Sequence, residues 1–275
     1  MKNLRHAKYK IEINENTQVS LSIGNDKIGK MINFSTLPGN SDNMLEAKGQ
    51  LLTDIPGTCC GNCAACFKNC YAVGSARLHH NAIIPSWGKN TLLLRQDPVK
   101  LFAQIDQQII KLNKKFYEGK ASEPEYKFYR HNVSGEIQNI QELELLNKLA
   151  LKHPAIKFGF YSKNTPVIVE FFKKHGQTAD NLTLNLSEWH GVLSETRKEL
   201  DKLGAKYNVF EYDDSNRAWC TLDDSAKERL SHEIHCPGIN KQGHHVKDQN
   251  GNALTCDKCQ LCYKKLGKTI AVYDH

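Results

Sequence analysis

Blocks of apolar and polar residues alternate along the middle of the chain, and they predict strands followed by helices. Apolar runs at 126–129, 156–161, 181–186 and 207–212 have the length of buried strands. Between them, apolar residues recur every three or four positions, as on one face of a helix. A repeating unit of roughly 25 residues therefore predicts parallel strands with covering helices.

The same pattern sets the expected helices. In the first of them, Leu101, Ile105, Ile109 and Leu112 share one face. The third is opened by Asn164-Thr165-Pro166, a capping residue before a proline of the first turn, and is closed at Gly176. The predicted helices span residues 98–116, 138–152, 164–176 and 194–204.

The two ends of the chain carry weaker patterns. Alternation at Tyr9–Ile13 predicts an antiparallel hairpin or edge element within residues 1–30. A strand is predicted at 31–34, ahead of Pro38-Gly39, and a last one at 269–273.

These elements predict an α/β fold. Successive right-handed β-α connections curl into a partial (β/α) barrel, and a doubly wound sheet is the alternative. The expected organisation is an N-terminal β element (1–30), a barrel (31–230) with a cysteine-rich loop at 59–70, and a cysteine-rich extension with the last strand (231–275).

Composition and charge bear on the cellular location and the partners of the protein. No apolar stretch approaches the ~20 residues of a membrane span, and the start has no apolar leader, so we expect a cytoplasmic, reducing location without a membrane partner. Clustered thiols are then metal ligands rather than disulfides. The net charge of +7 is spread along the chain, which fits a solvated surface, with a nucleic-acid partner as the alternative.

Five cysteines gather between residues 59 and 70, namely Cys59, Cys60, Cys63, Cys66 and Cys70. Three thiolates on one short loop can hold three irons of a [4Fe–4S] cluster and leave the fourth iron open. A tetrahedral zinc site is the alternative, although zinc more often uses two separated cysteine pairs.

A second group, Cys236, Cys256, Cys259 and Cys262, supplies four thiolates and would close a site completely. Its tight spacing favours a second [4Fe–4S] cluster, with a structural zinc site (Zn) as the alternative.

The motif Cys59-x3-Cys63-x2-Cys66, followed by Phe67, resembles the cluster motif of radical SAM enzymes. Ser134-Gly135-Glu136, after a predicted strand, is similar to the turn that holds the amino group of S-adenosyl-L-methionine (SAM) in that superfamily. The resemblance implies that Phe67 flanks the adenine. It also implies that the later strand-end residues Ser162, Lys163 and Ser187 contact SAM or substrate.

Over roughly residues 30–275 the chain also resembles the gene product 88 family of phages and mobile elements. Three segments carry this resemblance: Cys70-Tyr71-Ala72, Arg130 to Glu136, and Tyr161-Ser162-Lys163. It implies Cys59, Cys66 and Cys70 as ligands and sets Tyr71 beside the cluster, whereas the radical SAM motif implies Cys63 in place of Cys70. Cys60 belongs to neither set.

The two resemblances imply a radical SAM-type enzyme that cleaves SAM reductively and needs an electron donor such as a flavodoxin or ferredoxin. The alternative is a non-enzymatic protein that binds nucleic acid and in which the bound metals (iron–sulfur or zinc) only stabilise the fold. A third hypothesis keeps the clusters but assigns different chemistry to the open iron. The sequence leaves the substrate undefined.

Overall fold

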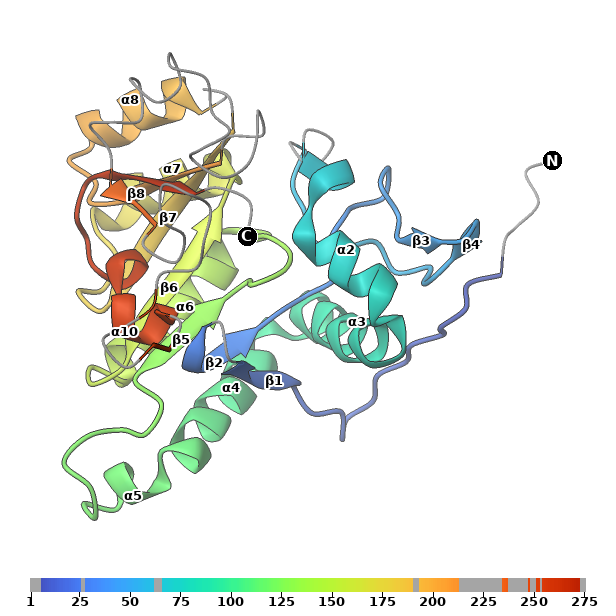
Figure 1. The fold of residues 1–275 in the computed structure, drawn as a ribbon, viewed down its shortest axis with the longest axis horizontal. Helices are drawn as coiled ribbons and strands as arrows, with labels where there is room; N and C mark the ends of the chain where they lie inside the picture. Colours follow the sequence, from blue (N-terminus) through green and yellow to red (C-terminus); the bar gives the residue numbers. More distant parts are fainter. Residues whose placement is uncertain are drawn as a thin grey trace.

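The centre of the molecule is an eight-stranded sheet with the order β1-β2-β5-β6-β7-β8-β10-β9 (Figure 1). A computed structural model describes residues 6–25, 28–61, 66–189, 193–212, 234–236, 247, 251–252 and 254–272. Within this sheet only β1 and β2 pair antiparallel; its other described pairs are parallel. The strands are β1 Leu21–Asn25, β2 Gly29–Phe34, β5 Phe128–His131, β6 Lys157–Ser162, β7 Leu182–Trp189, β8 Asn208–Tyr212, β9 Ile234–His235 and β10 Thr269–Val272.

From β2 to β8 the strands lie side by side in chain order. A doubly wound sheet reverses its strand order at a central switch point. The described strands show no such reversal between β2 and β8, which argues against that alternative; only at the far edge does β10 lie between β8 and β9. The expected α/β class with a mostly parallel sheet is confirmed. In the described part of the chain, the outer strands β1 and β9 do not pair with each other, so no closed barrel is seen.

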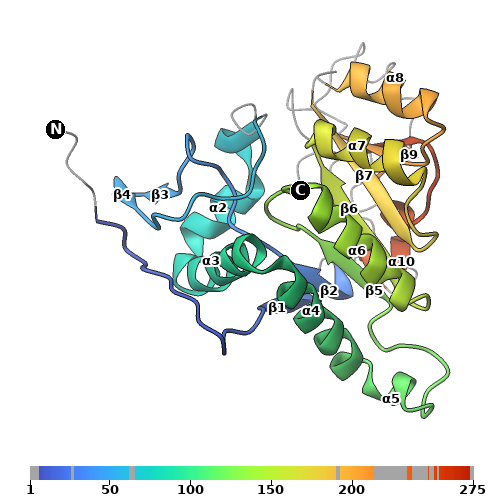
Figure 2. The same cartoon turned by 180° about the vertical axis from the view of Figure 1, so that it is seen from behind.

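Four helices form a continuous layer on one face of the sheet, each packed against the next in the order α4, α6, α7, α8 (Figure 2). Their bounds are α4 Pro98–Leu112, α6 Ile140–Lys152, α7 Thr165–His175 and α8 Ser194–Lys202. Across the described residues, no helix has the length and apolar character needed to cross a membrane.

The helix expected at 98–116 stops earlier, because the side chain of Asn113 bonds the backbone of Tyr126 through N–H···Oδ1 at 2.8 Å. A separate turn, α5 Lys114–Tyr117, follows it. Asn164 does not cap α7 with its side chain, since its amide donates to the Ile137 carbonyl at 2.7 Å.

The alternating segment Tyr9–Ile13 forms no strand; the antiparallel edge element expected within residues 1–30 begins instead at β1. Tyr9 makes only an isolated bridge to Thr53, and Ile11 instead packs into the space beside Gly88. The antiparallel hairpin is formed by β1 and β2. The N-terminal segment covers a second hydrophobic cluster, built with two unpredicted helices, α2 Tyr71–Leu78 and α3 His80–Gln96, and near the short hairpin of β3 Glu46–Ala47 and β4 Gln50–Leu51.

Alternate residues of each strand face opposite sides of the sheet. Tyr129, Phe158 and Phe160 are buried in the main core under the helices. The other face receives the late cysteine segment, α10 Cys256–Cys259 and the 3-10 turn Leu261–Tyr263. There the Tyr263 ring lies so close to Gly159 that an added Cβ would stand 2.9 Å from it.

Two buried asparagines attach this late segment to the sheet. Asn185 Nδ2 donates to the Cys262 carbonyl at 3.0 Å. Asn208 Nδ2 donates to the Lys264 carbonyl at 2.9 Å, and its Oδ1 accepts from the Leu266 amide at 2.9 Å.

We therefore predict that Asn208→Leu loosens the C-terminal segment. The substitution leaves buried backbone groups without partners, which lowers the free energy of unfolding by roughly 2–4 kcal/mol in urea titrations. Trypsin should cleave after Lys264 faster than in the unchanged protein. Asn14→Leu, at an exposed residue with local hydrogen bonds, is the control; equal cleavage in both variants would refute the anchoring role.

Candidate metal and cofactor site

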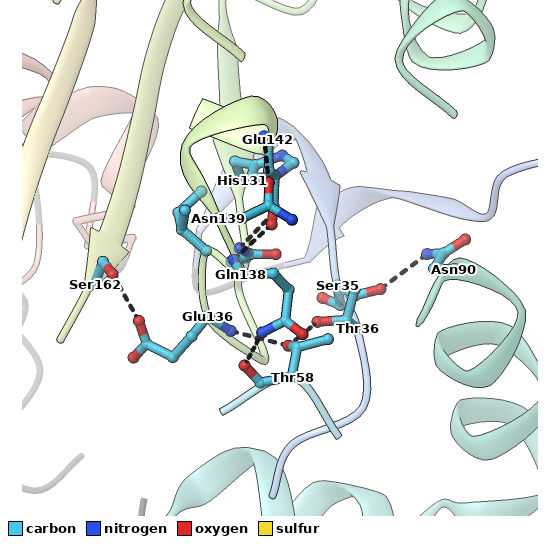
Figure 3. Close-up of polar contacts among 12 residues, drawn as sticks. Ser35, Thr36, Thr58, Asn90, His131, Glu136, Gln138, Asn139, Glu142 and Ser162 are labelled. Carbon is cyan, nitrogen blue, oxygen red and sulfur yellow. Dashed lines mark hydrogen bonds and ion pairs between the residues drawn. The ribbon is translucent and has the colours of Figure 1, made fainter. Parts of the chain in front are cut away.

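The turn Ser134-Gly135-Glu136 lies just beyond β5, at the edge where the parallel strands end (Figure 3). Gly135 has a φ of +87°, a left-handed conformation that favours glycine. A Cβ at this residue would stand 1.9 Å from Thr36 Oγ1 and 2.2 Å from Thr58 Oγ1. Only glycine fits at this position, which gives a steric reason for the glycine in the turn that the sequence analysis singled out.

The two threonines bind the turn to the cysteine loop. Thr36 N–H donates to the Ser134 carbonyl at 3.0 Å, and the two threonine hydroxyls lie 2.7 Å apart. Thr58 Oγ1 accepts the amide of Glu136 at 3.0 Å (Figure 3). Because Thr58 directly precedes Cys59, the first thiol of the loop is fixed relative to the Glu136 carboxylate.

Glu136 is buried and is held by the end of β6. Its Oε2 accepts the Ser162 hydroxyl at 2.8 Å and the backbone N–H of Lys163 at 2.9 Å. Burial raises the pKa of Glu136, while the Lys163 charge and the two hydrogen bonds act in the opposite direction.

Lys163 connects this carboxylate to the cysteines. Its Nζ donates to Cys66 Sγ at 3.4 Å. Burial acts to lower the pKa of Lys163, but the charges of Glu136 and Cys66 outweigh it, so the pKa is raised above the usual lysine value. The ammonium therefore stays protonated between a carboxylate and a thiol.

The structure brings Cys59, Cys66 and Cys70 together around this ammonium. Burial raises the pKa of the Cys66 thiol; Lys163 opposes this, and Cys70 and Cys59 add to it. Burial also raises the pKa of Cys70, opposed by backbone N–H groups at the start of α2. Cys59 Sγ accepts the Gly39 amide at 3.2 Å.

Cys63 lies outside the described residues, so its competition with Cys70 is not decided here. Among the described residues, no group of three or more His, Cys, Asp or Glu side chains is arranged around a single metal ion. No disulfide joins the cysteines of the described residues.

The other three residues predicted to contact the cofactor are found at separate positions. Phe67 packs beside Gly39, where an added Cβ would approach its ring to 2.8 Å. The Tyr71 hydroxyl donates to the Val133 carbonyl, next to the Ser134 turn. Ser187 does not follow a strand end, because β7 continues to Trp189.

The four late cysteines line one pocket of about 50 Å³ with Arg130 and Tyr161. Gln260, in a left-handed conformation (φ +62°), turns the chain between α10 and the following 3-10 turn. Burial raises the pKa of Cys262 to about 12; Tyr161 opposes this, and Cys236 adds to it. The predicted set Cys236, Cys256, Cys259 and Cys262 thus lines one pocket, although its first and last members are 26 positions apart in the sequence.

A family model described as gene product 88 matches residues 17–265, nearly the whole chain. The chain belongs to this family. It matches no curated protein and no solved structure. The gene product 88 description names no activity, so function here depends on the site itself.

Three features of the site in this gene product 88 protein were not predicted. The hydroxyls of Thr36 and Thr58 are one. The buried pair of His131 and Glu142 is another, with Nε2 and Oε1 3.0 Å apart, and it stiffens the end of β5 (Figure 3). The third is the side chain of Arg130. The sequence marked Arg130 as the first residue of the segment shared with the gene product 88 family and as a charge inside an apolar strand, but neither signal gave it a role.

Gly135→Ala should be far more destabilising than Gly176→Ala. Both glycines have positive φ, which costs an alanine about 1–2 kcal/mol. Gly176 has open space around it, whereas Gly135 meets two hydroxyls. We expect a total loss of about 3 kcal/mol or more for Gly135→Ala in chemical unfolding. Equal losses in the two variants would contradict the described packing.

Proposed function

We propose that this protein is a radical SAM-type iron–sulfur enzyme, with its open-site [4Fe–4S] cluster on the 59–70 loop and SAM bound across the Ser134-Gly135-Glu136 turn. The observation that carries the proposal is the chain of contacts from Cys66 through Lys163 to Glu136. Two motifs 70 residues apart in the sequence, the cluster loop and the predicted SAM-binding turn, meet at one sheet edge.

The residues present fit such a cluster. Thiolates are the ligands of iron–sulfur clusters, and each ligand binds its own iron, so the thiols need not converge on one point. Burial raises the pKa of Cys66 and Cys70, and the positive charge of Lys163 and of the start of α2 offsets part of that rise. A bound cluster would supply the remaining positive charge that the deprotonated, ligating form needs. These contacts favour Cys59, Cys66 and Cys70 as the ligands, with Cys63 as the competitor.

Glu136 fits the role of binding an amino group. Both of its hydrogen bonds from the end of β6 reach Oε2. Oε1 would then accept the amino group of SAM, and the fixed Oε2 would set the orientation of the carboxylate. Exclusion of water from this buried carboxylate strengthens such a contact.

When bound, the cluster and SAM would supply reductive carbon–sulfur cleavage and a radical, with electrons from a flavodoxin or ferredoxin. The chain order of the parallel strands supports a partial barrel of the radical SAM type. The late cysteines would hold a second, auxiliary [4Fe–4S] cluster, with Zn as the alternative. The substrate stays undefined.

The test is anaerobic purification and reconstitution, followed by SAM with a reductant and detection of 5′-deoxyadenosine. Cys66→Ser should lose the iron of the first cluster and all SAM cleavage. Glu136→Gln should keep that iron but cleave SAM at least about tenfold more slowly, because a neutral amide no longer pairs with the amino group.

Cys60→Ser is the matched control, since Cys60 belongs to neither ligand set, and it should retain both clusters and cleavage. Iron-free protein that binds only zinc and cleaves no SAM would overturn the proposal. Salt-dependent binding of DNA or RNA that survives Glu136→Gln would favour the nucleic-acid alternative instead.

A further inference from the structure

Arg130 connects β5 to the late cysteine pocket. It precedes the buried His131 in the strand, and its side chain lies on the opposite face of the sheet, where the C-terminal segment packs. Arg130 lines the pocket together with the four late cysteines. The guanidinium carbon lies 4.2 Å from the centre of the Tyr161 ring, which holds the group flat against that strand.

The charge of Arg130 has no matching carboxylate in the described part of the chain. Its buried Nε atom makes no hydrogen bond there, and none of the ion pairs found there includes Arg130. A buried cation and a buried N–H without an acceptor are both costly.

The groups that surround Arg130 are tyrosines and thiols. The pocket that Arg130 lines also holds Tyr161, Tyr263 and the four late cysteines, and its described lining includes no carboxylate. The anionic partner of this guanidinium is thus to be sought among the pocket cysteines.

Four cysteine thiolates carry more negative charge than a divalent zinc ion or an oxidised [4Fe–4S] core can neutralise. A loaded pocket would be a buried anion whose sulfurs accept hydrogen bonds. We propose that Arg130 is the counter-ion and hydrogen-bond donor of a metal centre held by Cys236, Cys256, Cys259 and Cys262. Arg130 is a positioning residue that ties this centre to β5.

This inference rests on the second metal centre of the proposed function and is independent of SAM cleavage. It also explains why a charged residue stands in the middle of an apolar strand. A planar guanidinium stacked on Tyr161 can present Nε–H to a sulfur without moving, which a lysine cannot do.

The test measures zinc affinity of the late site alone. Zn²⁺ is titrated against a chromophoric chelator into metal-free, full-length protein in which Cys59, Cys63, Cys66 and Cys70 are replaced by serine. We expect one tightly bound zinc, for which the four thiols that line the pocket must close in on the ion. Arg130→Gln should weaken its binding roughly 10–100-fold, as loss of a hydrogen-bonding partner of metal ligands does.

Arg130→Lys separates the effect of charge from that of shape, because it keeps the cation but not the planar donor. Its zinc affinity should lie between that of the protein with Arg130 and that of Arg130→Gln. Arg77→Gln, which removes an equal charge from an exposed side chain bonded to the Glu46 carbonyl, is the control and should bind zinc unchanged. Circular dichroism checks that each variant is folded.

Unchanged affinity in Arg130→Gln would overturn the inference while leaving the second centre in place. If the protein with the four serine replacements and an unchanged Arg130 binds no zinc, both the second metal centre and the role of Arg130 are overturned. Failure of SAM cleavage in the unchanged protein would remove the proposed activity but would not touch the zinc affinities, so the two failures are distinguishable.

Discussion

The half-buried ammonium of Lys163 makes the interaction on which the candidate site depends. Its Nζ reaches Cys66 Sγ at 3.4 Å, and the amide of the same residue donates to Glu136 at 2.9 Å. A buried carboxylate and several half-buried thiols lie around one cation. Charges interact strongly in a low-dielectric interior, so this arrangement stabilises only if all partners are present together. Lys163 therefore fixes the cysteine loop against the strand ends before any ligand is considered.

A second cation repeats this pattern one strand earlier. Arg130 on β5 and Lys163 after β6 lie on neighbouring strands, and each is next to one of the two cysteine groups. The sheet keeps these charged groups apart from the apolar core, since alternate residues of a strand face either the helices or the opposite side. The helix side holds the apolar core, and the other side and the strand ends hold the polar chemistry. One sheet thus places two thiol sites close together without exposing its core.

Much of the fold could be predicted because its strands are short apolar runs with clear helical periodicity between them. Helix α3 was missed because part of its buried face is polar or featureless: Gly88, Asn90 and Thr91 are all buried. The two-residue strand β9 pairs only through tertiary contact and carries no pattern of its own. The alternating segment at Tyr9–Ile13 looked like a strand because its apolar residues pack on a cluster rather than in a ladder.

The candidate site could be predicted in part for a similar reason. Ser134-Gly135-Glu136 and Ser162-Lys163 follow strands that the pattern locates, and parallel strands bring their ends to one edge. The bond from Thr58 to Glu136 and the gathering of the late cysteines around Arg130 join residues far apart in sequence. No local pattern encodes such contacts. These long-range contacts can be seen only in the folded chain.

The central claim is that an open iron on the 59–70 loop faces the Glu136 carboxylate. Electron paramagnetic resonance of the anaerobically reduced protein, recorded with and without SAM, tests it most directly. We expect an iron–sulfur signal that changes when SAM is added, because SAM would bind the open iron. A signal that is identical with and without SAM, or no iron–sulfur signal at all, would contradict it.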